Sequence, residues 1–282
     1  MKAYKNEIFV GERALYASCD LKIKDSVFKD GESHLKESRN LDIDNCIFEW
    51  KYPLWNCTDV KVKNSTLLTT ARSGIWYTSD ISMEDCVIDA PKTFRRSVGI
   101  TLKNCHLPNA EETLWNCEGV YIDGVNAAGD YFGIGSKDVT AKGLMLSGNY
   151  AFDGAKNIEI SNSRLISKDA FWNTENVTVR NSTVIGEYLG WNSKNLTLID
   201  CTVESNQGLC YIDGLTLIRC KLINTDLAFE YCKDIDAELI GHLDSLKNPT
   251  SGKITADSIG EIILDNKFCD PEKTKITLKD NN

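Results

Sequence analysis

The sequence lacks several features that would assign it to a familiar class. It has no Cys-x-x-Cys pair although it contains 11 cysteines, and this spacing is typical of zinc sites, iron–sulfur clusters and dithiol redox centres. The cysteine count is odd, and the 282-residue chain is far longer than the small secreted scaffolds that disulfides hold together. We therefore expect no metal site, no cofactor and no disulfide framework, and the cysteines need another explanation.

Long apolar runs and basic patches are also missing. No stretch approaches the roughly 20 apolar residues of a membrane span, and the first residues, MKAYKNEIFVGERALY, lack the apolar run of a signal peptide. The net charge is −9 and the isoelectric point is near 5.0, which argues against binding to nucleic acid. We expect an acidic cytoplasmic protein without a membrane or nucleic-acid partner, and the sequence does not indicate its oligomeric state.

One repeated unit fills most of the chain. Phrases such as NLDIDNC, DVKVKNS, NVTVRNS and NLTLIDC recur, and we call the first apolar residue of each phrase the anchor. The anchors lie at positions 21, 41, 60, 81, 100, 120, 139, 158, 177, 196, 215, 235 and 254. Eight of the twelve intervals are 19 residues and the others are 20 or 21, so about thirteen copies occupy residues 19–265.

Each copy predicts a short strand between sharp corners. The anchor and the residue two places later are apolar, as in Leu41 and Ile43, while the residue between them is usually polar, which indicates a strand with one buried face. The residue before the anchor is Asn, Asp or Gly in the first twelve copies, and these residue types tolerate the positive φ of a tight corner. Two further corner columns follow in each unit.

Three corners per unit imply three faces, and short strands that return in register every 19 residues imply a parallel β-helix. Helical and leucine-rich repeats would need a helical period or the LxxLxLxxN phrase, and neither is present. We therefore predict an all-β, single-domain, right-handed parallel β-helix, or solenoid, of about thirteen coils with three short strands each. Residues 1–18 and 266–282 are predicted to form an N-terminal and a C-terminal cap around the helix at 19–265.

The cysteines fit this fold as small side chains that point into the coils beside the corners. One column shares its positions between cysteine and serine, as in Cys46, Cys86, Ser26 and Ser65, and a second column does the same around Cys57. Small, mildly apolar side chains can fill the interior of a tight corner without crowding it. The sequence therefore favours a structural role for these thiols over redox or metal chemistry.

A column of tryptophans lies five residues before the anchors and is predicted to point outward, because the residue before each one is apolar. An outward aromatic row could stack against sugar rings, or loops could cover it; the sequence leaves both interpretations open. The aromatic and basic residues of this stripe, some of them on neighbouring columns, are the predicted substrate-binding set: Trp55, Trp76, Tyr77, Arg72, Arg95, Arg96, Trp115, Trp172 and Trp191.

Acidic residues continue along the same side. Arginines beside aromatics could bind an acidic sugar, and carboxylates on neighbouring coils could act as the acid and base of a glycoside hydrolase. Exposed charge is also common for solubility alone, and no pair stands out. The predicted catalytic candidates are Glu112, Asp130, Asp153 and Asp169.

The coil array resembles the pectin-lyase-like right-handed β-helix proteins. Phrases such as GERALY, WKYPLWNC, ETLWNC, GDYFGIGS and EYLGWNS resemble a narrower bacterial family that is catalogued only as a domain of unknown function. Polygalacturonase-type hydrolases of the wider superfamily carry NTD, DD and GHG phrases. This chain has Asn224-Thr225-Asp226 and a partial Gly241-His242, but it has no Asp-Asp pair.

Two functional interpretations follow. The first is a carbohydrate-binding or carbohydrate-active protein that contacts an oligo- or polysaccharide through the outward Trp/Arg stripe. The second is a non-catalytic scaffold or protein-interaction rod whose tryptophan column is covered by loops. An exposed column would favour the first interpretation, and a covered column would favour the second.

Overall fold

The structure is a computed structural model in which residues 1–279 are described. It divides into two compact units, residues 1–147 and 148–282, which we describe separately. Both units consist of parallel β-strands, and the helical segments among the described residues are two single 3-10 turns, Thr69–Ala71 and Pro271–Lys273. No helix within residues 1–279 has the length and apolar character needed to span a membrane.

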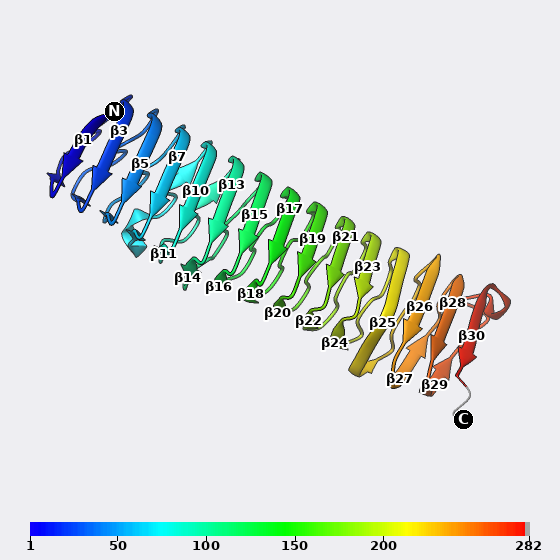
Figure 1. The fold of residues 1–282 in the computed structure, drawn as a ribbon. Coiled ribbons are helices and arrows are strands. Elements are labelled where there is room, and N and C mark those ends of the chain that lie inside the picture. The colour runs from blue at the N-terminus through cyan, green and yellow to red at the C-terminus, as the bar shows by residue number, and fades with distance from the viewer. Residues whose placement is uncertain (280–282) are drawn as a thin grey trace. The chain divides into compact units, whose positions relative to one another are not determined.

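In the first unit, eight strands lie side by side in one parallel sheet (Figure 1). Each strand pairs in register with the strand of the next coil, so that Leu21 lies opposite Leu41, and Leu41 opposite Val60. The strands are β1 (Lys2–Lys5), β3 (Cys19–Lys24), β5 (Arg39–Asp44), β7 (Thr58–Lys63), β10 (Ser79–Glu84), β13 (Val98–Lys103), β15 (Glu118–Asp123) and β17 (Lys137–Lys142).

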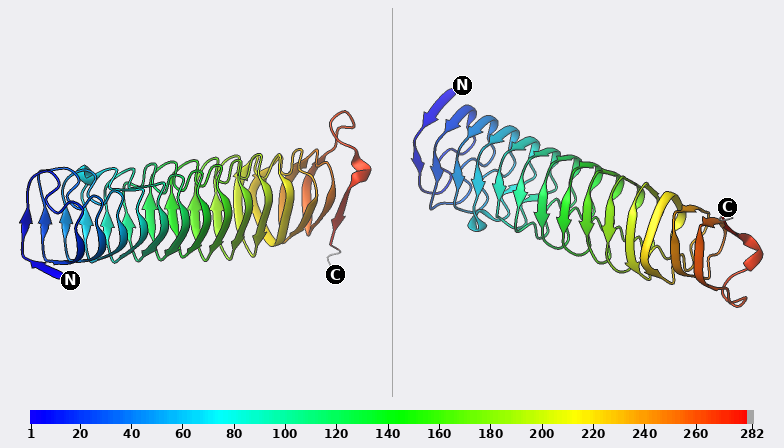
Figure 2. Two further views of the ribbon diagram at one scale, coloured as in Figure 1. Left: turned by 90° about the horizontal axis from the view of Figure 1, so that it is seen from above. Right: turned by 60° about the horizontal axis from the view of Figure 1, so that its bottom comes forward.

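A second sheet of the first unit consists of shorter strands, one after each long strand. Two further views show each turn of the blue to green chain passing through a long strand, a short strand and a loop (Figure 2). The short strands are β2 (Ile8–Phe9), β4 (Val27–Phe28), β6 (Ile47–Phe48), β8 (Thr66–Leu67), β11 (Val87–Ile88), β14 (His106–Leu107), β16 (Asn126–Ala128) and β18 (Met145–Ser147).

The second unit repeats the pattern. Its long strands are β19 (Lys156–Ser161), β21 (Glu175–Arg180), β23 (Lys194–Ile199), β25 (Asp213–Asp226), β26 (Ile235–Leu239), β28 (Gly252–Ala256) and β30 (Thr274–Leu278). Its second face holds β20 (Arg164–Ile166), β22 (Thr183–Ile185) and β24 (Thr202–Asn206), which pairs with the second half of β25, and then β27 (His242–Lys247) and β29 (Ser258–Ile263).

The predicted fold class is confirmed: the chain is all-β and forms a β-solenoid. The eight long strands of the first unit and the seven of the second add up to fifteen coils. Thirteen of these strands lie within residues 19–265, as the anchors predicted. The two others, β1 and β30, lie in the segments predicted as caps and pair in parallel with β3 and β28. The apolar side chains of these segments include exposed ones, such as Ile8 and Phe268.

The third face carries less strand than predicted. Among the described residues it forms strands only at β9 (Ile75–Trp76) and β12 (Phe94–Arg95). Elsewhere alternate residues adopt positive φ, as in Glu112, Leu114 and Asn116 with φ of 48°, 59° and 50°. A backbone that alternates between left-handed and other conformations cannot continue a pleated strand, so this face turns as a loop.

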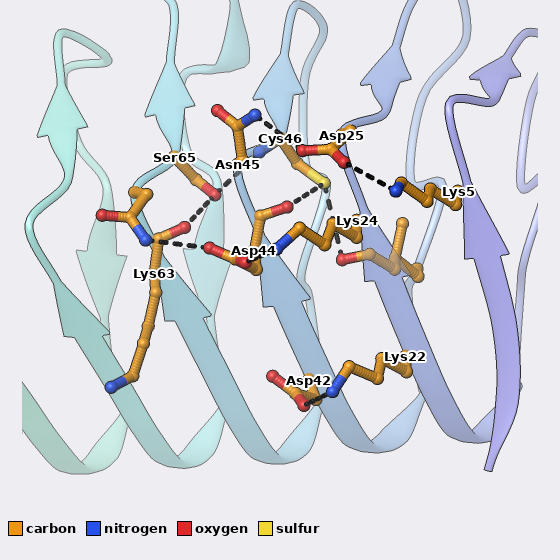
Figure 3. Close-up of polar contacts among 12 residues, drawn as sticks. Lys5, Lys22, Lys24, Asp25, Asp42, Asp44, Asn45, Cys46, Lys63 and Ser65 are labelled. Carbon is orange, nitrogen blue, oxygen red and sulfur yellow. Dashed lines mark hydrogen bonds and ion pairs between the residues drawn. The ribbon is translucent and has the colours of Figure 1, made fainter.

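The interior thiols and hydroxyls act as hydrogen-bonding groups at the corners. The Cys46 thiol donates to the Asp44 carbonyl at 3.4 Å, and the Cys46 backbone N–H donates to the Ser65 hydroxyl of the next coil at 3.0 Å (Figure 3). The Ser65 hydroxyl in turn donates to the Lys63 carbonyl at 2.6 Å. All 11 cysteines are free and ten are buried. Cysteine and serine therefore perform the same task at this corner, as the shared column predicted.

Candidate functional site

The tryptophan column of the first unit forms a stack that we call the aromatic ladder: Lys36, Trp55, Trp76, Arg95 and Trp115. The rings of Trp55 and Trp76 are stacked with centroids 5.1 Å apart and planes 10° apart. The Arg95 guanidinium lies 4.6 Å from the Trp76 ring and 4.7 Å from the Trp115 ring. Neighbours on both sides therefore cover the two faces of Trp76.

The indole N–H groups of the ladder are bonded to the protein backbone. Trp55 donates to the Ser73 carbonyl and Trp76 donates to the Lys92 carbonyl at 2.8 Å. Both side chains are half-buried, so the column is neither fully exposed nor fully covered by loops. Because sugar stacking requires an open ring face, the geometry leaves no stacking platform at Trp76.

Two of the basic residues beside the ladder, Lys92 and Arg95, are paired within the protein. Glu112 accepts from Lys92 at 2.9 Å and from Arg95 at 3.0 Å. Arg72, Arg96 and Tyr77 are exposed, and neither arginine forms an ion pair within the described part of the chain. The structure thus brings Arg95 and Glu112 together, but as partners of each other.

The four predicted catalytic carboxylates are divided between the two units. Glu112 and Asp130 belong to the first unit, where the Glu112 N–H donates to the Asp130 carbonyl at 2.9 Å. Asp153 and Asp169 belong to the second unit, and Asp153 accepts from the Asn173 amide at 2.9 Å. The Glu112 carboxylate is occupied by its two cations.

Asp169 has an unusual environment. Its side chain is almost fully buried, and one carboxylate oxygen has no hydrogen-bond partner. Burial raises the pKa of Asp169, while Lys168 and a hydrogen bond from Tyr150 act in the opposite direction. The nearby carboxylates of Glu187 and Asp153 also raise the pKa of Asp169.

The second unit has its own aromatic ladder, which contains the predicted residues Trp172 and Trp191. Their ring centroids are 6.2 Å apart, and the Trp191 ring lies 4.4 Å from that of Tyr211. The Trp172 indole donates to the Tyr188 carbonyl at 2.8 Å. The arrangement repeats the backbone bonding seen at Trp76, which indicates that these tryptophans join successive coils.

A shallow groove of about 500 Å³ opens on the long-strand sheet of the first unit. It crosses five coils, from β7 to β17, and combines corner residues with outward side chains of the strands. Its lining residues are Asp59, Val60, Lys61, Asp80, Ile81, Ser82, Gly99, Ile100, Thr101, Gly119, Val120, Tyr121, Asp138 and Thr140.

The groove exists because the corner column changes residue type. The column carries Asp59 and Asp80, then Gly99 and Gly119, then Asp138. Both glycines have positive φ, 69° and 66°, which Asn and Asp adopt at the same corner in other coils. A Cβ at Gly119 would meet nothing closer than 3.6 Å. The missing side chain at Gly119 therefore leaves the hollow open, whereas at Gly99 the Asp80 Oδ1 lies 2.7 Å from where a Cβ would be.

Sequence reasoning treated these glycines as corner residues and did not predict the groove. The signal was present: two consecutive glycines interrupt a column that is otherwise mostly Asn and Asp, beside the small side chains of Ser82 and Thr101. Elsewhere the same column forms side-chain ladders, as between Asn40 and Asp20 at 2.6 Å and between Asn195 and Asn176 at 2.9 Å. An interrupted ladder marks the hollow.

In residues 1–279, no three side chains of His, Cys, Asp or Glu gather in a way that could hold a metal ion. The adjacent thiols of the interior column donate to backbone carbonyls, as Cys86 does to the Glu84 carbonyl at 3.2 Å.

Comparison with solved structures returns other solenoids at low similarity. The A-module of mannuronan C-5 epimerase AlgE4 from Azotobacter vinelandii is 10% identical, with 99% of this chain and 88% of that chain covered and a TM-score of 0.34. A double mutant of the periplasmic alginate epimerase AlgG is 10% identical, with 92% and 78% covered and a TM-score of 0.36.

The pentapeptide repeat protein HetL from the cyanobacterium Nostoc is also 10% identical, with 80% of this chain and 84% of that chain covered and a TM-score of 0.33. At these TM-scores the likenesses carry no information on what this chain does. No curated protein matches the chain. A family model described as "Protein of unknown function (DUF3737)" matches residues 2–277, and the chain therefore belongs to the DUF3737 family.

Proposed function

We propose that the first unit is a non-catalytic binding module for an extended carbohydrate chain, and that the groove, rather than the Trp/Arg stripe, is the contact surface. The observation that carries this proposal is the groove itself: an open hollow of mixed polar and apolar lining across five coils, with glycine backbone between Asp80 and Asp138. Hydroxyls of Ser82, Thr101 and Thr140 line it, and such groups exchange hydrogen bonds with sugar hydroxyls.

The coil spacing also fits a carbohydrate. Successive coils lie about 4.8 Å apart, which is close to the length of one pyranose residue along an extended chain. Sugar rings that follow the groove would meet equivalent side chains on each coil, such as Ser82, Thr101 and Tyr121. The exposed ring of Tyr121 offers an aromatic contact of the kind that the closed ladder does not provide.

A second candidate is a protein-interaction scaffold without a carbohydrate ligand. The closure of the aromatic ladder favours it, because a column that stacks on itself and bonds its indoles to the backbone stabilises the coils without needing a ligand. In this case the groove would have no oligosaccharide ligand.

A groove-filling variant tests the proposal. Gly119→Asn restores the residue type that the column has in other coils, at a φ that Asn tolerates and with room for its Cβ. We expect Gly119→Asn to fold normally and to lose oligosaccharide binding. The control is Gly214→Asn, which adds the same side chain at the same corner in the second unit, where the Asn195 amide must turn aside because a Cβ would lie 2.9 Å from its Oδ1.

The measurement is isothermal titration calorimetry against a panel of neutral, acidic and amino oligosaccharides, with thermal melting to check the fold. Binding by the wild type and by Gly214→Asn, together with its loss in Gly119→Asn, supports the groove. A panel that produces no heat and no shift of Tm in the wild type overturns the carbohydrate proposal and leaves the scaffold. Equal binding by Gly119→Asn places the contact elsewhere.

A further inference from the structure

A row of apolar side chains lies on the outer side of the short-strand sheet of the first unit. In each short strand one residue points into the core, as Phe48 does, and the residue before it points outward. The outward residues pair in register from coil to coil, and we call them the apolar stripe: Ile8, Val27, Ile47, Thr66 and Val87. Ile8, Ile47 and Val87 are 61%, 39% and 40% exposed. The stripe therefore leaves apolar surface uncovered over successive coils, not at scattered single positions.

The same outward position is polar in the second unit. Arg164, Thr183 and Thr202 occupy it in β20, β22 and β24, and Lys221 pairs in register with Thr202. The strand itself therefore does not require an apolar side chain there, and threonine has a similar preference for strands. The apolar residues at this position in the first unit indicate a surface that another molecule covers.

A second outward column lies beside the apolar stripe, two residues further along each coil. We call it the flanking column, and in coil order it consists of Val10, Lys29, Glu49, Leu68, Asp89 and Pro108. Val10 and Leu68 are 62% and 38% exposed. None of the charged members forms an ion pair within residues 1–279, although Asp89 accepts a hydrogen bond from the Thr69 hydroxyl. The column thus presents one cation and two anions that are free to pair with a second molecule.

We propose that the apolar stripe and the flanking column form the interface of a symmetric dimer, in which two copies of this chain pack face to face with their coils in opposite order. The charges of the flanking column lead to this arrangement. When the second coil of one copy faces the fifth coil of the other, Lys29 meets Asp89 of the partner subunit, and symmetry makes this contact twice. Val27 then faces Val87 of the partner subunit, so the apolar stripes cover each other.

The charges also select one register of this dimer. A shift by one coil in one direction places Glu49 against Glu49 of the partner subunit, and a shift in the other direction places it against Asp89 of the partner subunit. Both shifts bring like charges together, which disfavours them. The six coils of the flanking column span roughly 24 Å, at about 4.8 Å per coil. A patch of this length fits a weak, concentration-dependent dimer rather than an obligate one.

Sedimentation velocity of the full chain over a wide range of protein concentrations tests the dimer, and we expect a monomer–dimer equilibrium. The double variant Ile47→Lys/Val87→Lys should raise the dimer Kd about a hundredfold, because it places charge at the centre of the interface. Lysine occurs at this outward position in the second unit, as Lys221, so the variant should fold, and thermal melting of the monomer checks this. The matched control Thr183→Lys/Thr202→Lys adds the same charges to the second unit and should leave the Kd unchanged.

Charge reversal tests the arrangement of the two copies. Lys29→Asp and Asp89→Lys should each raise the Kd about tenfold, and Lys29→Asp/Asp89→Lys should restore the value of the wild type. Within one chain these two positions are three coils, or about 14 Å, apart, so restoration can come only from a contact between copies.

A wild type that stays monomeric at every concentration overturns the proposal, and so does a dimer that is unaffected by Ile47→Lys/Val87→Lys. A double charge reversal that does not restore the Kd overturns the opposite order of the coils. The proposed carbohydrate function is separate from these outcomes, because the groove lies on the long-strand sheet.

Discussion

Two columns of side chains in the first unit repeat with the same coil spacing. The first is filled by its own stacked side chains, and the second is left open. In the aromatic ladder each member is large and lies on the next, so that Trp76 has Trp55 at 5.1 Å on one face and Arg95 at 4.6 Å on the other. In the corner column of the groove, Gly99 and Gly119 leave nothing to stack. The comparison suggests that a solenoid column is closed by its own side chains unless the repeat is interrupted.

The largest expected effect is a loss of stability when the aromatic ladder is broken, without a change in binding at the groove. Trp76→Ala removes a stacked ring, a cation–π contact and the bond to the Lys92 carbonyl, and we expect it to lower the free energy of unfolding by about 3 kcal/mol. Oligosaccharide binding at the groove should not change. Chemical denaturation and calorimetry on the same sample measure both quantities.

Tyr77→Ala serves as the control for Trp76→Ala. Tyr77 is exposed and touches the ladder only edge-on, with its ring 6.4 Å from that of Trp76, so its loss should cost less than about 1 kcal/mol. If Trp76→Ala folds normally but no longer binds sugar, the ladder is the binding surface and the comparison is wrong.

A smaller effect concerns the coil interior, where His34 is fully buried beside Phe28. Burial lowers the pKa of His34, and a backbone contact with Lys29 offsets this in part. Neither ring nitrogen has a hydrogen bond of regular geometry. The unfolded chain therefore takes up the proton more readily than the folded one, so stability is complete above the unfolded pKa near 6.5 and falls as the pH drops below it.

We expect this histidine to remove up to about 2 kcal/mol of stability between pH 7.5 and pH 5. His34→Leu should lack this component, since Leu189 occupies the equivalent position of another coil and is buried there. Urea denaturation of both proteins at several pH values measures the difference. Parallel pH profiles for the two proteins would assign the acid sensitivity to surface groups instead.

The smallest expected effect is the difference in stability between removing a paired carboxylate, Asp44, and an unpaired one, Asp80, on the same sheet. Asp44 accepts from Asn64 and Lys24, both at 2.9 Å, and these partners hold the pKa of Asp44 below its usual value. Its contribution is therefore present at neutral pH and is lost as the pH falls through the folded pKa. Asp44→Asn should cost about 1 kcal/mol, and Asp80→Asn, which removes no partner, should change stability by less than about 0.5 kcal/mol.

Thermal melting of Asp44→Asn and Asp80→Asn at neutral and acidic pH measures both values. A clear loss of stability in Asp80→Asn would mean that the groove carboxylates support the fold, and the contrast between paired and unpaired aspartates would then fail.

The fold was predictable because every repeat of a β-solenoid carries the same residue types at its corners and interior positions. The Asn, Asp or Gly before each anchor indicated a corner, and positive φ is found there, as at Asn40 and Asp59. The shared Cys/Ser column indicated inward side chains, and Cys46 and Ser65 confirm it. These features depend on neighbours within one coil or in the adjacent coil at the same column, which a single sequence shows directly.

The candidate site was less predictable. The alternation of residues placed the tryptophans on the outer side, but it could not show that the Trp76 ring stacks on that of Trp55, because stacking depends on the side-chain torsions of both residues. The charge of Arg95 indicated an anion, yet its anion is Glu112 of the next coil. The groove lies where the corner column changes to glycine, at Gly99 and Gly119. Glycine carries no functional group, so a search for chemically active residue types does not find it.

The in-register pairing of coils also bears on how such a chain can change its length. A segment that is one whole coil, such as the 19 residues from Leu41 to Asp59, after which Val60 takes the position opposite Leu41, leaves every remaining pair matched when it is duplicated or removed. A segment that is not a whole coil would move the following anchors out of the interior. Tandem duplication and unequal recombination of the gene can therefore add or delete whole coils without redesigning the rest.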